Sequence, residues 1–138
     1  MNIEQGANCF LRLLHHYIRA NKGCLIPVKE HGNIPTGKLV LGYYDEELVY
    51  IRPEVVLPFF RAAADKESIP IRKVLEKLFA WNYIKVHWIL TDKVRYRPQK
   101  WLGKTRKRFI TFYRQQLENY IQEHHCGEGD NEQSRICK

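Results

Sequence analysis

The spacing of the apolar residues changes between Phe79 and Ile84, and this change limits the folds open to the chain. From Ile71 to Phe79 the apolar residues recur every three or four positions, as on one side of a helix. From Ile84 they alternate with polar residues, as in a half-buried strand. Asn82, a residue that accepts left-handed backbone, stands between the two patterns. A helix that leads almost directly into a strand predicts an α+β fold.

Apolar periodicity predicts helices at both ends of the folded region. Residues 3–21 carry one apolar stripe, with Asn2 as the expected N-cap. A closing helix is expected over residues 114–123. Residues 126–138 are polar and contain glycine, which favours a disordered tail. Because 138 residues with 44% hydrophobic content suit one compact core, we expect a single domain over 1–125.

Two more helices are predicted in the middle of the chain. Residues 53–66 have helical spacing, and we expect the regular helix to begin near Leu57. That start would place Pro58 in the first turn, where proline is tolerated best. Residues 71–79 carry the next apolar stripe, with Ser68 as the expected N-cap.

The remaining apolar runs are typical of strands and loops. Residues 39–44 and 48–51 flank a short polar stretch and predict a hairpin, and 27–37 read as a loop. Further strands are predicted over 84–88, 93–97 and 108–112, with 98–105 as the loop before the last of them.

The positive charge is confined to one segment. Residues 93–108 contain eight lysines and arginines and no acidic residue, so this segment alone matches the net charge of +8. Such a segment favours an acidic partner, which can be a nucleic acid, an anionic membrane surface or an acidic protein.

The order of the predicted elements resembles a winged helix, in which two helices are followed by a β-hairpin wing. A more specific resemblance covers residues 7–113. An amphipathic helix ending in Ile18-Arg-Ala-Asn21 leads to Gly42-Tyr-Tyr-Asp-Glu-Glu-Leu-Val-Tyr-Ile51, and then come Pro53, the helix pair and the basic stretch from Arg95 to Ile110. This resembles the C-terminal winged-helix domain of replicative primase-helicase proteins of phages and integrative elements.

The resemblance implies an α+β winged helix with an additional N-terminal helix and hairpin. It also implies an accessory role in DNA replication or in the maintenance of a mobile element. Primase or helicase activity is not implied, because the chain has no phosphate-binding GxxxxGK[ST] loop: Pro98 stands five residues before Gly103-Lys-Thr105, where that motif requires glycine.

We therefore expect a nucleic-acid-binding protein that contacts phosphates, with DNA favoured over RNA as the partner. The basic wing supplies the cations, and an exposed aromatic within it can stack on an unpaired base. The predicted contact residues are Lys93, Arg95, Arg97, Lys100, Trp101, Lys104, Arg106, Lys107 and Arg108. Tyr96 lies in the same segment.

A weaker candidate surface is the polar face of the helix over 71–79. Arg72, Lys73 and Lys77 could meet a major groove there, although Glu76 interrupts them. An ordinary solvated helix face explains these residues as well. For the basic wing, the alternatives are a solvated edge strand, which lysine and arginine protect from aggregation, and docking on an acidic protein. The second alternative gives a non-enzymatic interaction module bound to a replication or regulatory partner.

The other chemistry-bearing residues give no site. His124, His125, Cys126 and Cys137 match no standard zinc spacing, so no metal or cofactor is expected. No catalytic motif is present, and we expect neither an enzyme nor a small-molecule substrate. The chain has no secretory signal and no apolar run that could cross a membrane, and its cysteines form no CxxC pair. These features favour a cytoplasmic protein with reduced thiols.

Overall fold

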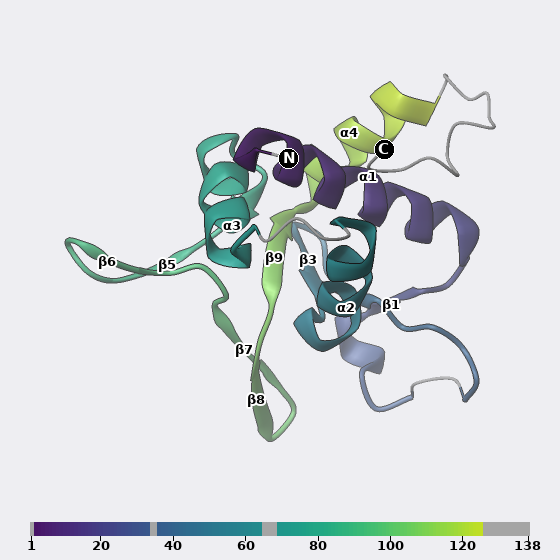
Figure 1. The fold of residues 1–138 in the computed structure, drawn as a ribbon. Helices are drawn as coiled ribbons and strands as arrows, with labels where there is room; N and C mark the ends of the chain where they lie inside the picture. The colour runs from purple at the N-terminus through teal and green to yellow at the C-terminus, as the bar shows by residue number, and fades with distance from the viewer. Residues whose placement is uncertain (1, 34–35, 65–68, 126–138) are drawn as a thin grey trace.

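The computed structural model describes residues 2–33, 36–64 and 69–125, and it has an α+β fold. Over these residues it contains four α-helices, a mixed five-stranded sheet and two separate two-stranded hairpins. Figure 1 shows the helices gathered around one side of the sheet, with the two hairpins projecting away in different directions. The α+β class predicted from the sequence is therefore confirmed.

The helices are α1 (Ile3–Ala20), α2 (Pro53–Ala64), α3 (Ile71–Ala80) and α4 (Arg114–His125), with a short 3-10 turn η1 (Val28–Glu30). The Asn2 side chain accepts a hydrogen bond from the Gln5 amide, and the Gln5 side chain accepts one from the Asn2 amide. This reciprocal pair is a capping box, so the predicted N-cap of α1 is confirmed. Asn82 has φ +66°, the left-handed conformation expected of it after α3.

The large sheet has the strand order β1-β2-β3-β9-β4. Its strands are β1 (Leu25–Pro27), β2 (Gly42–Tyr44), β3 (Leu48–Ile51), β9 (Ile110–Tyr113) and β4 (Ile84–Lys85). The predicted hairpin is β2–β3, and β9 pairs antiparallel with both β3 and β4. Strand β1 pairs parallel with β2. The first part of the predicted loop over 27–37 is thus the end of a strand and η1.

The two faces of the sheet are covered differently. Side chains such as Ile51, Phe112 and Ile84 belong to the main core together with residues of all four helices. Phe10 of α1 stacks on Phe112 at 6.3 Å between ring centroids. Because side chains alternate along a strand, Tyr50 and its neighbours lie on the opposite face. The hydrophobic core on that face contains no residue of the four α-helices.

A second, smaller core covers part of this opposite face. It consists of Ile26, Val40, Tyr43, Tyr50, Leu102 and Phe109. Phe109 meets the rings of Tyr43 and Tyr50 edge-on, at 6.0 and 5.9 Å. Leu102 lies next to the turn of a hairpin and Phe109 directly follows the second strand of that hairpin, so this core holds both ends of the hairpin against the sheet.

The basic segment forms two hairpins rather than the single wing that was predicted. The first joins β5 (His87–Leu90) to β6 (Lys93–Arg95), and the second joins β7 (Gln99–Leu102) to β8 (Thr105–Arg108). Residues 98–105, expected to be a loop, therefore include the whole of β7. Gly103 has φ +63° in the β7–β8 turn, a conformation that glycine adopts without strain. The predicted strand over 84–88 is divided between β4 and β5.

The start of α2 differs from the prediction. The helix begins at Pro53, and the Arg52 carbonyl accepts hydrogen bonds from the Val55 and Val56 amides. Pro58 lies inside the helix and is exposed. The late start near Leu57 was therefore wrong. Helix α3 has Pro70 as its N-cap, and Ser68, its predicted cap, lies outside the described residues.

Helix α1 also buries one polar side chain among its apolar residues. His15 of α1 is buried and meets the Tyr120 ring edge-on. Cys24 is a free thiol as expected, whereas Cys9 is disulfide-bonded, so the expectation of a reduced thiol there was wrong. None of the described helices is both long and apolar enough to cross a bilayer. The tail predicted over 126–138 lies outside the described residues.

Candidate functional site

The predicted contact residues are distributed over the two hairpins and the link between them. Lys93 and Arg95 belong to β6, and Arg97 follows that strand. The larger group lies on the β7–β8 hairpin and its turn, and consists of Lys100, Trp101, Lys104, Arg106, Lys107 and Arg108. Figure 1 shows the two hairpins pointing in different directions, so the basic segment does not present one continuous face.

The β7–β8 register determines which of these side chains share a face. Trp101 pairs with Arg106 and Lys100 pairs with Lys107, and paired residues project to the same side. One face of the hairpin thus carries Gln99, Trp101, Arg106 and Arg108. The other face carries Lys100 and Lys107 together with Leu102, which is buried against the sheet.

The cations of the β7–β8 hairpin are available to a ligand. Lys104, Arg106, Lys107 and Arg108 are exposed, and Lys100 is half-buried. No salt bridge involves any of them within the described part of the chain. A group of cations that form no salt bridges produces a positive potential that attracts anions.

Trp101 is held at the surface beside one of these cations. Its side chain is 59% exposed, and the Arg106 guanidinium lies 5.3 Å from the centre of its ring. A cation over an aromatic face is attracted by the ring quadrupole. The pair therefore offers two planar groups to a ligand from one face of the hairpin.

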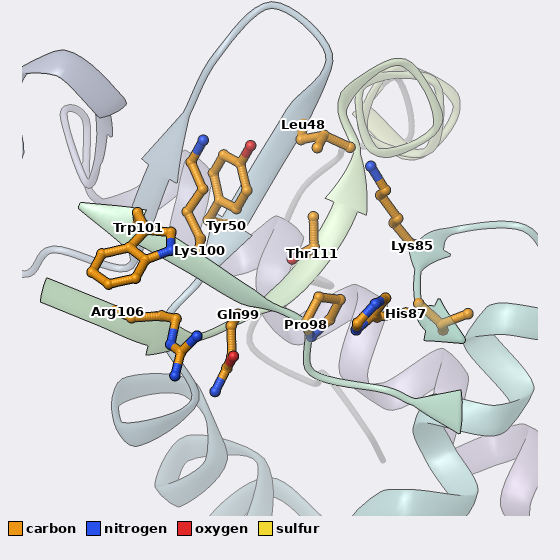
Figure 2. A pocket seen from close by; sticks show the side chains of 11 residues that line it. Leu48, Tyr50, Lys85, His87, Pro98, Gln99, Lys100, Trp101, Arg106 and Thr111 are labelled. Carbon is orange, nitrogen blue, oxygen red and sulfur yellow. The ribbon is translucent and has the colours of Figure 1, made fainter. Parts of the chain in front are cut away.

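An open cleft of about 440 Å³ lies between the two hairpins and the uncovered face of the sheet. Figure 2 shows Trp101 and Arg106 towards one end of its lining, Lys85 and His87 towards the other, and Thr111 between them. The full lining is Leu48, Tyr50, Lys85, Val86, His87, Pro98, Gln99, Lys100, Trp101, Arg106 and Thr111. It contains several basic side chains and no carboxylate.

The floor of the cleft is a row of side chains across three strands. Tyr50 of β3 is opposite Thr111 of β9, and Thr111 is opposite Lys85 of β4. Thr111 is buried, and its hydroxyl donates to the Phe109 carbonyl at 3.5 Å. The row therefore presents an aromatic ring at one end and an ammonium group at the other.

A polar network holds the Tyr50 end of this row. The Tyr50 hydroxyl donates to the Asp45 carboxylate at 2.8 Å, and the Lys100 ammonium lies 5.1 Å from the Tyr50 ring centre. Burial and the hydrogen bond to Asp45 raise the pKa of Tyr50. Burial disfavours the charged form of Asp45, but hydrogen bonds from Leu48, Tyr50 and Glu47 and the charge of Lys100 lower its pKa overall. Asp45 is thus ionised and Tyr50 neutral at neutral pH.

The other aromatic of the basic segment has a structural role. Tyr96 meets Phe79 of α3 edge-on at 6.3 Å, and the Arg72 guanidinium lies 5.2 Å from its ring centre. Phe79 also meets Trp88 of β5 at 6.4 Å. These contacts attach the β5–β6 hairpin to α3, and they occupy the ring of Tyr96.

The helix residues proposed as secondary contacts are partly neutralised. Glu76 lies 3.6 Å from both Arg72 and Lys73, and Arg72 also covers Tyr96. Lys77 is half-buried on the same helix. Arg72 and Lys73 are nevertheless well exposed, with 68% and 54% of their side-chain surface open to solvent.

Several cleft residues were not predicted from the sequence. Lys85 and His87 were assigned only as the polar positions of a half-buried strand, and Tyr50 and Thr111 only as strand residues. The alternation of Lys85 with apolar neighbours was a usable signal, because it placed Lys85 on the polar side of the sheet, whereas His87 belongs to β5 of the separate hairpin. Tyr50, Thr111 and Lys85 line the same cleft as β7 only because β9 pairs with both β3 and β4, which are distant in the sequence.

No group of three or more His, Cys, Asp or Glu side chains that could hold a metal occurs among the described residues. His124 lies on α4, where one ring nitrogen is 2.9 Å from the Tyr120 carbonyl oxygen. Cys126 and Cys137 fall outside the described part of the chain.

Comparisons with protein-family models, with curated proteins and with solved structures found no match to this chain.

Proposed function

We propose that this protein binds nucleic acid, and DNA in particular, through phosphate contacts made by the β7–β8 hairpin. The observation that carries the proposal is the group of five cations on this hairpin, four of them exposed and none in a salt bridge within the described residues. Lysine and arginine at such positions neutralise phosphates and release condensed counterions. Lys93, Arg95 and Arg97 on the β5–β6 side are further contacts, and Arg72, Lys73 and Lys77 are secondary ones.

The fold assigned to this function is a winged helix. Its support is the order α1, β3, α2, α3, β4, hairpins, β9, in which β9 lies between β3 and β4 in the sheet. A winged helix has a helix-turn-helix followed by a wing between its last two strands, and α2–α3 and the segment between β4 and β9 occupy those positions. In this proposal the wing contains two hairpins, and β1 and β2 extend the sheet.

The proposed biological role is accessory to DNA replication or to mobile-element maintenance, with no catalysis of its own. Contacts to phosphates do not depend on the base sequence of the DNA. The proposed protein would therefore bind without a specific target site. The contact between Glu76 and the cations of α3 also argues against base readout by that helix.

A second candidate is a protein-docking module on a replication or regulatory partner. Three consecutive apolar residues at the β5–β6 hairpin favour it, because Trp88, Ile89 and Leu90 are 53%, 48% and 58% exposed. Exposed apolar groups of this size are often part of protein interfaces. Trp88, Ile89 and Leu90 belong to the β5–β6 hairpin, which carries fewer cations than the β7–β8 hairpin.

The test is a salt titration of binding to random-sequence duplex and single-stranded DNA. Four phosphate contacts give a slope of log K against log salt of about −3.6 on duplex and somewhat less on single strands. A measurable affinity with a slope of this size supports the proposal. No binding to either substrate at low salt contradicts it and leaves the docking module.

A further inference from the structure

The cleft between the hairpins has features that phosphate binding alone does not require. Phosphate contacts need only exposed cations, yet here a half-exposed tryptophan and a guanidinium lie at one end of a cleft. Figure 2 shows Gln99 and Arg106 beside Trp101, while Lys100 and Tyr50 lie on the other side of β7. The cleft therefore combines planar groups with separate cations.

We infer that this cleft accepts one unpaired nucleotide of a single-stranded segment. Its base stacks on Trp101, beside Arg106, and its phosphates lie near Lys100 and Lys85. The inference rests on the proposed function, because it specifies what part of the nucleic acid the same site holds. Aromatic rings and arginine guanidinium planes are the groups on which proteins stack unpaired bases.

Size and charge both fit this occupant. The cleft volume of about 440 Å³ lies in the range of about 300 to 1,000 Å³ that is common for small-ligand sites. The lining has no carboxylate that would repel a phosphate. Asp45 does not line the cleft, and its carboxylate accepts the hydrogen bond from the Tyr50 hydroxyl. The neutral Tyr50 ring and the Thr111 side chain lie between Lys100 and Lys85. The two ammonium groups are therefore at different ends of the cleft, and a phosphate can bind at either of them.

The inference favours single strands over duplex. In a duplex the faces of each base are stacked on their neighbours and cannot meet a protein side chain. The phosphate contacts of the β7–β8 hairpin, by contrast, are available to both forms. Base stacking is therefore the part of the affinity that distinguishes them.

The experiment compares three labelled probes by fluorescence anisotropy: a thymidine oligonucleotide, an abasic oligonucleotide of equal length, and a duplex. The wild-type protein is expected to bind the thymidine strand about tenfold more tightly than the abasic strand, which is the usual worth of one stacked base. Trp101→Ala is expected to remove this difference and to leave binding to the abasic strand and the duplex unchanged. Trp101→Phe should restore part of it.

Ile89→Ala is the control, because Ile89 is an exposed apolar residue of the β5–β6 hairpin that lies outside the cleft lining. It should bind all three probes as the wild type does. Equal binding of the thymidine strand by wild type and Trp101→Ala overturns the inference and leaves the phosphate-binding function intact. Failure of the wild type to bind any probe overturns the proposed function as well, so the two failures are distinguishable.

Discussion

The Asp45 carboxylate accepts a hydrogen bond from the Tyr50 hydroxyl at 2.8 Å, across the turn that joins β2 to β3. The same carboxylate accepts the Glu47 and Leu48 amides at 2.9 and 2.8 Å. It therefore closes the turn and orients the ring that forms one end of the cleft floor. A residue that the sequence places on a solvated hairpin tip thus has a defined structural task.

Replacing Asp45 with asparagine should destabilise the protein in a pH-dependent way. Because the pKa of Asp45 is lower in the folded protein than in the unfolded chain, ionisation favours folding above the unfolded value of about 3.9. That contribution is lost as the pH falls through the folded-state pKa. We expect Asp45→Asn to lower the free energy of unfolding by about 1 to 2 kcal/mol at neutral pH. In urea titrations, the difference from wild type should shrink at acidic pH, and a difference independent of pH would contradict this account.

The elements governed by local rules could be predicted from the sequence. Helix α1 follows from one apolar stripe and the cap at Asn2, and the β2–β3 hairpin follows from two β-prone runs around a polar turn. The left-handed backbone at Asn82 follows from the side chain's tolerance of that conformation. In each case the determining residues are neighbours in the chain.

The β7–β8 hairpin could not be predicted in this way. All four residues of β8 are exposed, so the strand has no apolar alternation to detect. Its partner β7 is held by Leu102, which packs with residues of β1, β2 and β3 far away in the sequence. The parallel pairing of β1 with β2 is likewise non-local. The cleft depends on these pairings, and therefore only Lys100, Trp101 and Arg106 of its lining were predicted as contact residues.

The start of α2 is indicated in the sequence by Pro53. Proline is favoured at the first position of a helix, where its missing amide is not needed, and Pro53 occupies that position. The predicted start near Leu57 instead placed Pro58 in the first turn. Within the helix Pro58 is exposed, so water can satisfy the carbonyl that lacks its amide partner.

Gly42 should tolerate no side chain. A Cβ there would overlap the carbonyl oxygen of Tyr50 on the neighbouring strand, and it would lie 3.0 Å from the Ile51 Cα. Since both are backbone atoms, relief requires the strands to move apart. We expect Gly42→Ala to cost more than about 2 kcal/mol of folding free energy. Gly32→Ala is the control, because a Cβ there meets nothing within 4 Å; equal thermal stability of the two variants would refute the close approach.

Phe79 should control the attachment of the β5–β6 hairpin. Its ring meets Trp88 and Tyr96, so Phe79→Ala removes the ring contacts that both make with α3, while Arg72 still lies over Tyr96. We expect faster amide hydrogen exchange in β5 and β6 and unchanged exchange in β7 and β8. Phe59→Ala is the comparison, since Phe59 is also half-buried but stacks on Tyr17 of α1. Equal exchange in β5–β6 for the two variants would show that Phe79 does not anchor this hairpin.

Reversing two charges on the β7–β8 hairpin should weaken binding to every nucleic-acid sequence to a similar degree. Lys104 and Lys107 are exposed and make no aromatic contact among the described residues, so Lys104→Glu with Lys107→Glu changes charge and leaves Trp101 and Arg106 in place. Each lost phosphate contact reduces the salt slope on duplex by about 0.9, and the double variant should therefore lose about 1.8.

The matched control for this prediction is Lys22→Glu with Lys38→Glu, which removes the same charge from exposed positions outside both hairpins. If binding depends only on the net charge of the protein, the two double variants will lose the same affinity and the same slope. If the hairpin is the contact surface, the slope falls only for the Lys104 and Lys107 variant, because released counterions are counted at the contact. A loss confined to one DNA sequence would instead indicate base readout by the hairpin.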